Sequence, residues 1–276
     1  MSNVNEVSAP EAEVAEVARH TSKEQFDRQA AHYDSQWAHW NRESVVWMLE
    51  QASVIPYKSV LDVATGTGYT ALAFAPHAER VVGLDVSTGM LAVARERAAE
   101  QGFTNTEFVE GPAESLPFPD ASFCLVTCRV AAHHFVDVER FVSETARVLK
   151  PGGLFLLADT TVPDGDAEAE RWQNEIELWR DPSHMRNLSP NQWRAVVEAS
   201  GLTVTEAHST GGGIELPLSD WLRKAGTPPE RAQRVHELLK NAPTGALEAF
   251  QIHYDPEGES GFTWPRVVLA ARKPRE

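Results

Sequence analysis

A glycine-rich loop and an acid that follows it are the first groups in this sequence that could do chemistry. Residues 60–71 read VLDVATGTGYTA, so an apolar run passes into small residues that include Gly66 and Gly68. Glycines at such a turn let the backbone approach a ligand closely, because no side chain fills the space. Asp85 ends the next apolar run, RVVGLD, and a carboxylate there can accept two hydrogen bonds from a ribose diol. The pattern predicts a cofactor that contains a ribose.

Two kinds of cofactor fit this pattern. Gly66, Gly68 and Ala71 satisfy the spacing of the dinucleotide fingerprint, which keeps a nicotinamide-dependent oxidoreductase open as one interpretation. Asp62, however, lies in the approach to the loop, where it would repel a pyrophosphate and attract a sulfonium amino acid with its ammonium group. The sequence also contains no Tyr-x-x-x-Lys pair, the proton relay of the short-chain dehydrogenases. These features favour the sulfonium cofactor.

Buried strands that alternate with helices must position these groups. Short apolar runs predict the strands, and apolar residues at helical spacing predict the helices between them. Such an alternation implies crossover units around a parallel sheet, which is a doubly wound α/β fold. Ligands of such sheets lie at the carboxyl ends of the strands, where the glycine loop also lies. The predicted strands are residues 59–64, 80–85, 106–109, 122–128 and 154–159, and the helices between them are 69–77, 90–101 and 138–149.

The alternation ends after Asp159. Residues 165–187 and 214–255 are predicted to be largely helical inserts. Both are too long for ordinary connections, so we expect them to form a lid over the ligand edge of the sheet. The remaining predicted segments are a tail at residues 1–20, cap helices at 21–53, a helix at 189–200 and strands at 202–207 and 262–271, with one domain spanning residues 21–276.

Composition limits the class of partner. The 276 residues include 25 Lys and Arg against 40 Asp and Glu, a net charge of −15. Partners rich in phosphate need an excess of basic residues, so this charge argues against nucleic acid and anionic membranes. Cys124 and Cys128 are too few for a disulfide framework, and no segment approaches the roughly 20 apolar residues of a membrane span. We therefore expect a cytoplasmic protein that acts on a small molecule.

Four motifs follow one another along the first part of the chain. They are DVATGTG at residues 62–68, the acid Asp85, AESLPF at 113–118 and RVLKPGG at 147–153. Together they resemble the class I S-adenosylmethionine-dependent methyltransferases, in particular the type-11 methyltransferase domain and its ubiquinone/menaquinone C-methyltransferase branch. The resemblance implies a Rossmann-like fold with a mostly parallel seven-stranded sheet. It also implies S-adenosyl-L-methionine as cofactor and S-adenosyl-L-homocysteine as product.

The resemblance assigns roles to residues around the loop. Asp62 and the loop backbone would hold the methionine part of the cofactor, and Asp85 would hold the ribose. Tyr33, on the N-terminal helix, would close over the cofactor. Pro112 stands where the family often has Asp or Asn, which leaves the adenine amine to Glu114 or to the backbone. The implied cofactor-binding set is Tyr33, Asp62, Ala64, Thr65, Gly66, Gly68, Asp85, Val86, Met90, Ala113, Glu114 and Arg129.

Residues after the fourth strand face the transferring methyl group in this family, which makes His134 and His133 the candidate catalytic residues. Placement of the two reactants supplies most of the catalysis. A base matters only when the acceptor must lose a proton, and histidine, with an ordinary pKa of about 6.5, suits that role. Arg180, His184 and Arg186 in the first insert are predicted to contact an acidic or phenolic acceptor. No metal site is predicted, because the histidines lack paired-ligand spacing.

The predicted function is methyl transfer to an oxygen, nitrogen or carbon nucleophile of a small metabolite. Two alternatives stay open. One is an NAD(P)-dependent oxidoreductase, and the other is a cofactor-binding protein of this fold that transfers no methyl group, such as a cyclase or a regulatory module. An apolar helical face in the second insert could pack on the sheet or on another subunit, which leaves a homodimer open.

Overall fold

A seven-stranded sheet forms the centre of the computed structural model, which describes residues 21–28, 30, 42–52, 56–210, 215–254 and 260–275. In spatial order the strands are β3 (Thr106–Glu110), β2 (Val81–Asp85), β1 (Val60–Val63), β4 (Phe123–Arg129), β5 (Leu149–Thr160), β10 (Arg266–Arg272) and β6 (Thr203–Thr210). The first five pair in parallel, whereas β10 runs antiparallel to β5 and β6. The predicted mostly parallel, doubly wound sheet is therefore confirmed.

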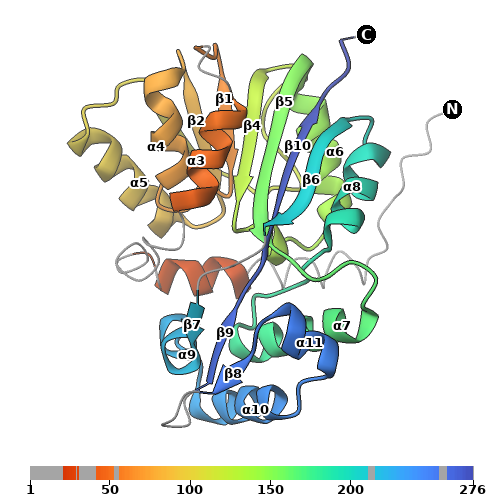
Figure 1. Cartoon of the computed structure of the whole chain (residues 1–276). Coiled ribbons are helices and arrows are strands. Elements are labelled where there is room, and N and C mark those ends of the chain that lie inside the picture. Colours follow the sequence, from red (N-terminus) through yellow and green to blue (C-terminus); the bar gives the residue numbers. More distant parts are fainter. Residues whose placement is uncertain are drawn as a thin grey trace, which may run out of the picture.

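Apolar sequence on both faces explains why these segments become central strands. Every residue of β1 and β2 is buried, as expected where helices cover both sides of a parallel sheet. One face is covered by α3 (Arg42–Gln51), α4 (Tyr69–Phe74) with the short helix η2 (Ala75–His77), and α5 (Thr88–Glu100), and the other by α6 (Val138–Val148) and α8 (Pro190–Ala199) (Figure 1). An apolar cluster fills the space on each face.

A second group of elements lies below the carboxyl edge of the sheet in Figure 1. We call it the insert region; it consists of α7 (Ala167–Arg180), β7 (Glu215–Pro217), α9 (Leu218–Ala225), α10 (Pro229–Lys240), α11 (Thr244–Ala249), β8 (His253–Tyr254) and β9 (Ser260–Thr263). Its strands form a small antiparallel sheet in the order β7-β9-β8. An apolar cluster of its own, with Trp172, Trp221 and Phe250, holds these elements together.

The end of the chain differs from the sequence prediction. We expected one strand over residues 262–271, but the structure has β9 in the insert region and β10 in the main sheet, with Trp264 and Pro265 between them. Proline has no backbone N–H to donate and does not continue a central strand. The interruption allows one stretch of sequence to join both sheets. The small sheet of the insert region was also not predicted.

The described N-terminal residues form a helix at residues 21–28, which lies between the main sheet and the insert region (Figure 1). The predicted tail at residues 1–20 lies outside the described residues. Within the described part of the chain, none of the helices has the length and apolar character needed to cross a membrane.

Candidate functional site

The loop after β1 bends sharply at the edge of the sheet. Its backbone takes left-handed angles at Ala64, Gly66 and Gly68, with φ of 53°, 55° and 81°. Gly68 then begins α4. Below the loop, a Cβ added at Gly83 would lie 2.8 Å from the side chain of Thr65, so the loop packs directly on the backbone of β2. The glycines and the neighbouring small residues are what allow this close packing.

Ala64 carries measurable strain, since a residue with a Cβ prefers negative φ by roughly 1–2 kcal/mol. We expect Ala64→Gly to raise the free energy of unfolding by about 0.5–1 kcal/mol, because relief of the strain exceeds the extra entropy of an unfolded glycine. Urea denaturation measures the change. Ala99→Gly, on the exposed side of α5, is the matched control and should lower stability by about 1 kcal/mol. A loss of stability in both variants would contradict the strain at Ala64.

Two buried carboxylates support the loop. Asp62 accepts hydrogen bonds from the hydroxyls of Thr65 and Thr127, each at 2.7 Å. Asp85 accepts from the backbone N–H of Gly66 at 2.8 Å and of Ser87 at 2.9 Å. Burial raises the pKa of both carboxyl groups, that of Asp85 to about 6, although the hydrogen bonds oppose the shift. A group that donates hydrogen bonds or carries positive charge would stabilise the ionised forms.

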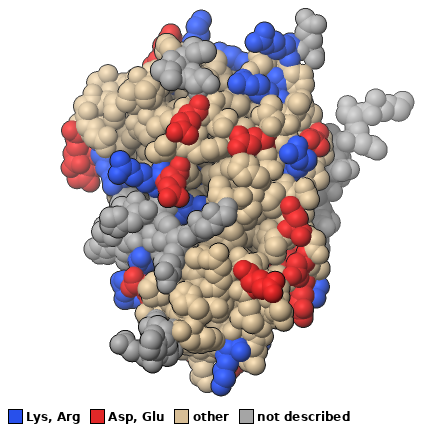
Figure 2. Space-filling view, in the orientation of Figure 1, with Lys and Arg blue, Asp and Glu red and all other residues tan. Residues whose placement is uncertain are grey.

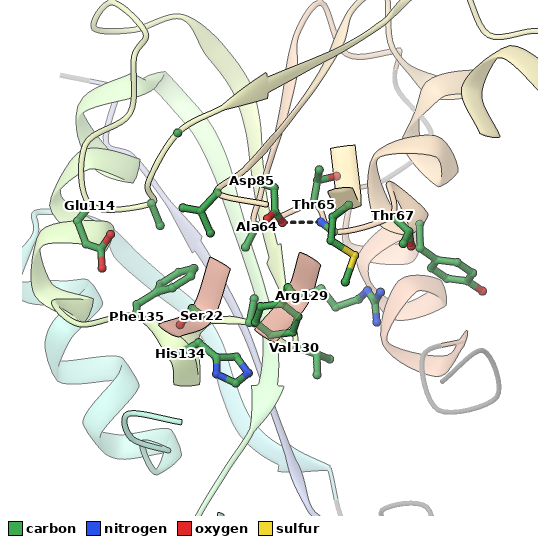
Figure 3. A pocket seen from close by; sticks show the side chains of 18 residues that line it. Ser22, Ala64, Thr65, Thr67, Asp85, Glu114, Arg129, Val130, His134 and Phe135 are labelled. Carbon is green, nitrogen blue, oxygen red and sulfur yellow. Dashed lines mark hydrogen bonds between the residues drawn. The ribbon is translucent and has the colours of Figure 1, made fainter. Parts of the chain in front are cut away.

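A pocket opens between this loop, the ends of β2 and β4, and helix 21–28 (Figure 3). It encloses about 890 Å³, which includes space open to solvent. Asp85 and Ala64 lie on one side of it, and His134 and Phe135 lie opposite (Figure 3). The lining residues are Ser22, Phe26, Ala64, Thr65, Gly66, Thr67, Tyr69, Asp85, Val86, Met90, Gly111, Ala113, Glu114, Arg129, Val130, Ala131, His134 and Phe135.

Of the predicted cofactor-binding residues that the structure describes, all but Asp62 and Gly68 line this pocket. Asp62 lies beneath the loop, where it contacts the pocket-lining Thr65. Gly68 lies at the start of α4, and a Cβ there would come within 3.0 Å of Ala94. Tyr33 lies outside the described residues.

Helix 21–28 closes one side of the pocket. Asp27 accepts hydrogen bonds from the hydroxyl of Ser87 at 2.5 Å and from the N–H of Gly89 at 3.0 Å. These bonds hold the helix against the first turn of α5, where an acid is also favoured by the helix dipole. Phe26 and Ser22 then reach the pocket from the same helix.

His134 lines the pocket in a fixed orientation. It lies in the short helix η3 (Ala132–His134), and its Nδ1 is 3.0 Å from the carbonyl oxygen of Ser183. Because a carbonyl oxygen can only accept, Nδ1 carries the proton and Nε2 is left as an acceptor. Burial, together with the charge of His133, lowers the pKa of His134 to about 3. The ring of Phe26 packs edge-on against it, with the centroids 5.0 Å apart. The pocket therefore has a neutral imidazole in its wall.

Comparison with known proteins connects this geometry to a family. Residues 61–157 match the family model described as a methyltransferase domain. The chain is 36% identical over 239 residues to the uncharacterized methyltransferase YcgJ of Bacillus subtilis, and the match covers 87% of this chain and 93% of that protein. The chain belongs to the S-adenosylmethionine-dependent methyltransferases.

Two further similarities are to a solved structure and to a quinone methyltransferase. The crystal structure of YcgJ from B. subtilis superposes on this methyltransferase with a TM-score of 0.78 at 35% identity, and covers 84% of this chain and 99% of that one. A demethylmenaquinone methyltransferase of Thermus thermophilus is 42% identical over 127 residues, which span 45% of this chain and 55% of that enzyme. The similarity to the quinone enzyme therefore covers less than half of this chain.

In this methyltransferase His133 does not line the pocket. Its Nδ1 forms an ion pair with Asp159 Oδ1 at 2.6 Å, and its backbone N–H donates to Asp159 Oδ2 at 3.0 Å. Burial alone would lower the pKa of His133, but the Asp159 carboxylate outweighs burial and raises it. The same pair lowers the pKa of Asp159 against the effect of burial. His133 thus holds a proton more readily than an ordinary imidazole, and its ring centroid lies 4.1 Å from that of His134.

The predicted substrate residues lie away from the described pocket. Arg180 pairs with Glu177 at 2.8 Å, and Arg186 pairs with Glu170 at 2.6 Å. Nε2 of His184 is 2.9 Å from the side-chain oxygen of Asn174, and burial lowers the pKa of the His184 ring to about 3. These side chains tie α7 and the turn that follows it together. Their contact with an acceptor stays a prediction.

Several pocket residues were not predicted as site residues. Val130 has φ of 51°, which is exceptional for a β-branched residue and is typical of functional sites. Phe26 could have been found, because its spacing from Tyr33 in the sequence fits one apolar face of the predicted N-terminal helix. Tyr69 lies in the first turn of α4 under the guanidinium of Arg129, 5.3 Å from the ring centroid. Its role depends on tertiary contact.

Acidic and basic side chains both lie on the face shown in Figure 2, with several basic ones near its top. The described residues contain no group of three or more His, Cys, Asp or Glu that could hold a metal ion.

Proposed function

We propose that this methyltransferase binds S-adenosylmethionine in the pocket beside Asp85 and transfers its methyl group to an oxygen, nitrogen or carbon nucleophile of a small molecule. The observation that carries the proposal is the use of the loop amides. The N–H of Gly66 donates to Asp85, and those of Thr65 and Gly68 donate to backbone carbonyls within and beside the loop. Amides already paired in this way are not free to hold a pyrophosphate, which argues against the nicotinamide alternative.

Charge supports the same cofactor. Asp62 is close enough to raise the pKa of Asp85, so the loop edge is a region of negative potential. The bound cofactor would supply an activated methyl group on a positively charged sulfonium, with an ammonium group nearby. Such a ligand stabilises both carboxylates, whereas a pyrophosphate would be repelled by them.

Each side of the pocket has a proposed role. Asp85 accepts hydrogen bonds from the ribose hydroxyls, and Asp62 fixes Thr65 and the loop. Val86 and Met90 pack on the adenine, with Ala113 and Glu114 at its edge. Arg129 donates from Nε to the Thr70 hydroxyl at 2.8 Å. In this proposal it lies beside the methionine part of the cofactor.

His134 orients the acceptor in this proposal. Its bare Nε2 can accept a hydrogen bond from an O–H or N–H group whose heavy atom attacks the methyl group. Because methyl transfer gains most from holding the two reactants in line, this orientation is the main contribution we assign to it. The insert region below the pocket favours a small enclosed acceptor over a macromolecule.

Calorimetry separates the leading proposal from its alternatives. We expect S-adenosylhomocysteine to bind with micromolar affinity and NADPH not to bind; the reverse result would make the protein an oxidoreductase. Transfer of tritiated methyl from labelled cofactor into a metabolite extract then tests turnover. Tight binding with no incorporation would favour a cyclase or a regulatory module.

Asp85→Ala tests the ribose contact. The lost charge-assisted hydrogen bonds are worth roughly 1.5–3 kcal/mol, so affinity for S-adenosylhomocysteine should fall about 10- to 100-fold. Wild-type affinity should also weaken as the pH falls through about 6, because the pKa of Asp85 is raised to about 6 and only its ionised form accepts both bonds. Calorimetric titrations between pH 5 and 8 measure both effects. An unchanged affinity in the variant would remove the ribose assignment.

A further inference from the structure

Arg266 is a half-buried cation that the proposed reaction does not use. It is the first residue of β10, where the chain passes from the insert region into the main sheet (Figure 1). Within the described part of the chain its side chain forms no ion pair and no hydrogen bond. Partly buried arginines are normally paired with an acid or a carbonyl oxygen. An unpaired guanidinium at the ligand edge of the sheet points to a ligand.

Strand register places Arg266 beside Arg129. Arg129 of β4 lies opposite Ala158 of β5, and Ala158 lies opposite Val268 of β10. Two residues further on, Thr160 lies opposite Arg266. Residues two apart on a strand point to the same face, and Ala158 and Val268 both pack in the cluster under α3 and α4. Arg266 and Arg129 therefore project from one face at the same edge, with β5 between them.

The two guanidinium groups affect each other. Burial and the positive charge of Arg129 lower the pKa of Arg266 to about 10, so that it stays protonated at neutral pH. Glu43 and Asp159 attract it, but neither is within ion-pair distance in the described structure. Two like charges on one face repel, and an anion between them removes that repulsion.

We propose that Arg266, with Arg129 beside it, forms a subsite for an anionic group, a carboxylate or a phosphate, of the methyl acceptor. Arg129 lines the cofactor pocket, so the subsite lies next to the reacting centre. The inference rests on the proposed function. The predicted class of acceptor, an acidic small molecule, is unchanged. Arg180 and Arg186 already have acidic partners, so we assign recognition of the acidic group to Arg266 instead.

Titration calorimetry with inorganic phosphate and with benzoate, at constant ionic strength, tests the subsite. We expect saturable binding of at least one anion with an affinity in roughly the millimolar range. Phosphate and benzoate distinguish a phosphorylated from a carboxylated acceptor. Arg266→Gln should weaken this binding about 10- to 100-fold, because hydrogen bonds to charged groups are lost. Arg223→Gln, which removes an arginine whose side chain is 62% exposed on α9, is the matched control and should bind like the wild type.

Two further measurements separate the possible results. Arg266→Gln should unfold at the wild-type temperature or above, since no ion pair is lost and repulsion is relieved; a purely structural arginine would lower it. Its affinity for S-adenosylhomocysteine should be unchanged. A parallel loss of that affinity would assign Arg266 to the cofactor's own carboxylate and overturn the acceptor subsite. Anion binding by Arg266→Gln equal to that of the wild type would also overturn the subsite, and so would the absence of saturable anion binding by the wild type. Failure of S-adenosylhomocysteine to bind the wild type would refute the proposed function instead.

Discussion

Asp159→Asn should lower the free energy of unfolding by about 3 kcal/mol near neutral pH. The side chain of Asp159 is 1% exposed and that of its partner His133 is 11% exposed, so the imidazolium would lose its counter-ion inside the protein. Breaking a buried ion pair typically costs about 3–5 kcal/mol. We expect the lower end, because His133 can release its proton when Asp159 is replaced. Urea denaturation followed by circular dichroism measures the difference.

The pH dependence identifies the pair as the cause. The pKa of His133 is raised above its ordinary 6.5. Its contribution to the free energy of unfolding is therefore full below pH 6.5 and is lost as the pH rises through the raised pKa. The pKa of Asp159 is lowered below 3.8, so its contribution is present above 3.8 and is lost only as the pH falls through the lowered value. The difference in the free energy of unfolding between wild type and variant should therefore be largest between pH 3.8 and pH 6.5, and should shrink at alkaline pH.

Glu175→Gln provides the control for that experiment. It removes an ion pair with Arg234 in which both side chains are more than 40% exposed, at 47% and 42%. Exposed pairs contribute about 0–1 kcal/mol, so stability should hardly change. A pH-independent loss in Asp159→Asn, or an equal loss in both variants, would contradict the buried pair.

The main sheet could be predicted because its strands are apolar on both faces. VLDV and VVGLD are buried throughout, and no surface strand would have that composition. The insert region was harder, because its apolar residues belong to a separate cluster that includes both helices and a small sheet. A run of apolar residues across Trp264 and Pro265 reads as one strand, and only tertiary structure assigns its halves to different sheets.

Side-chain roles depended on partners distant in the sequence. His133 and His134 are adjacent and chemically identical, so spacing alone gives them the same role. Asp159, 26 residues away, holds His133, and Ser183, 49 residues away, holds His134. Arg180 is different, because Glu177 lies at the i,i+3 position on the same helix and its pairing could have been anticipated.

His134→Ala should lower the rate of methyl transfer by about 10²–10³-fold while the affinity for S-adenosylhomocysteine stays within about threefold. Burial and the charge of His133 hold the pKa of His134 at about 3, so the ring is neutral throughout the working range and is a weak base. Its contribution is then mainly orientation of the acceptor through Nε2. Initial rates of tritiated-methyl incorporation, together with calorimetry, measure the two quantities.

Variants at the same position distinguish orientation from proton removal. His134→Gln keeps an acceptor oxygen but cannot take up a proton, so it should recover a large part of the rate if orientation dominates. The rate of the wild type should show no titration by His134 between pH 5 and 9, because the pKa of this ring, about 3, lies well below that range. His208→Ala, at a side chain 54% exposed on β6, should leave the rate unchanged. A wild-type rate in His134→Ala would mean that His134 only packs against Phe26, with the two ring centroids 5.0 Å apart.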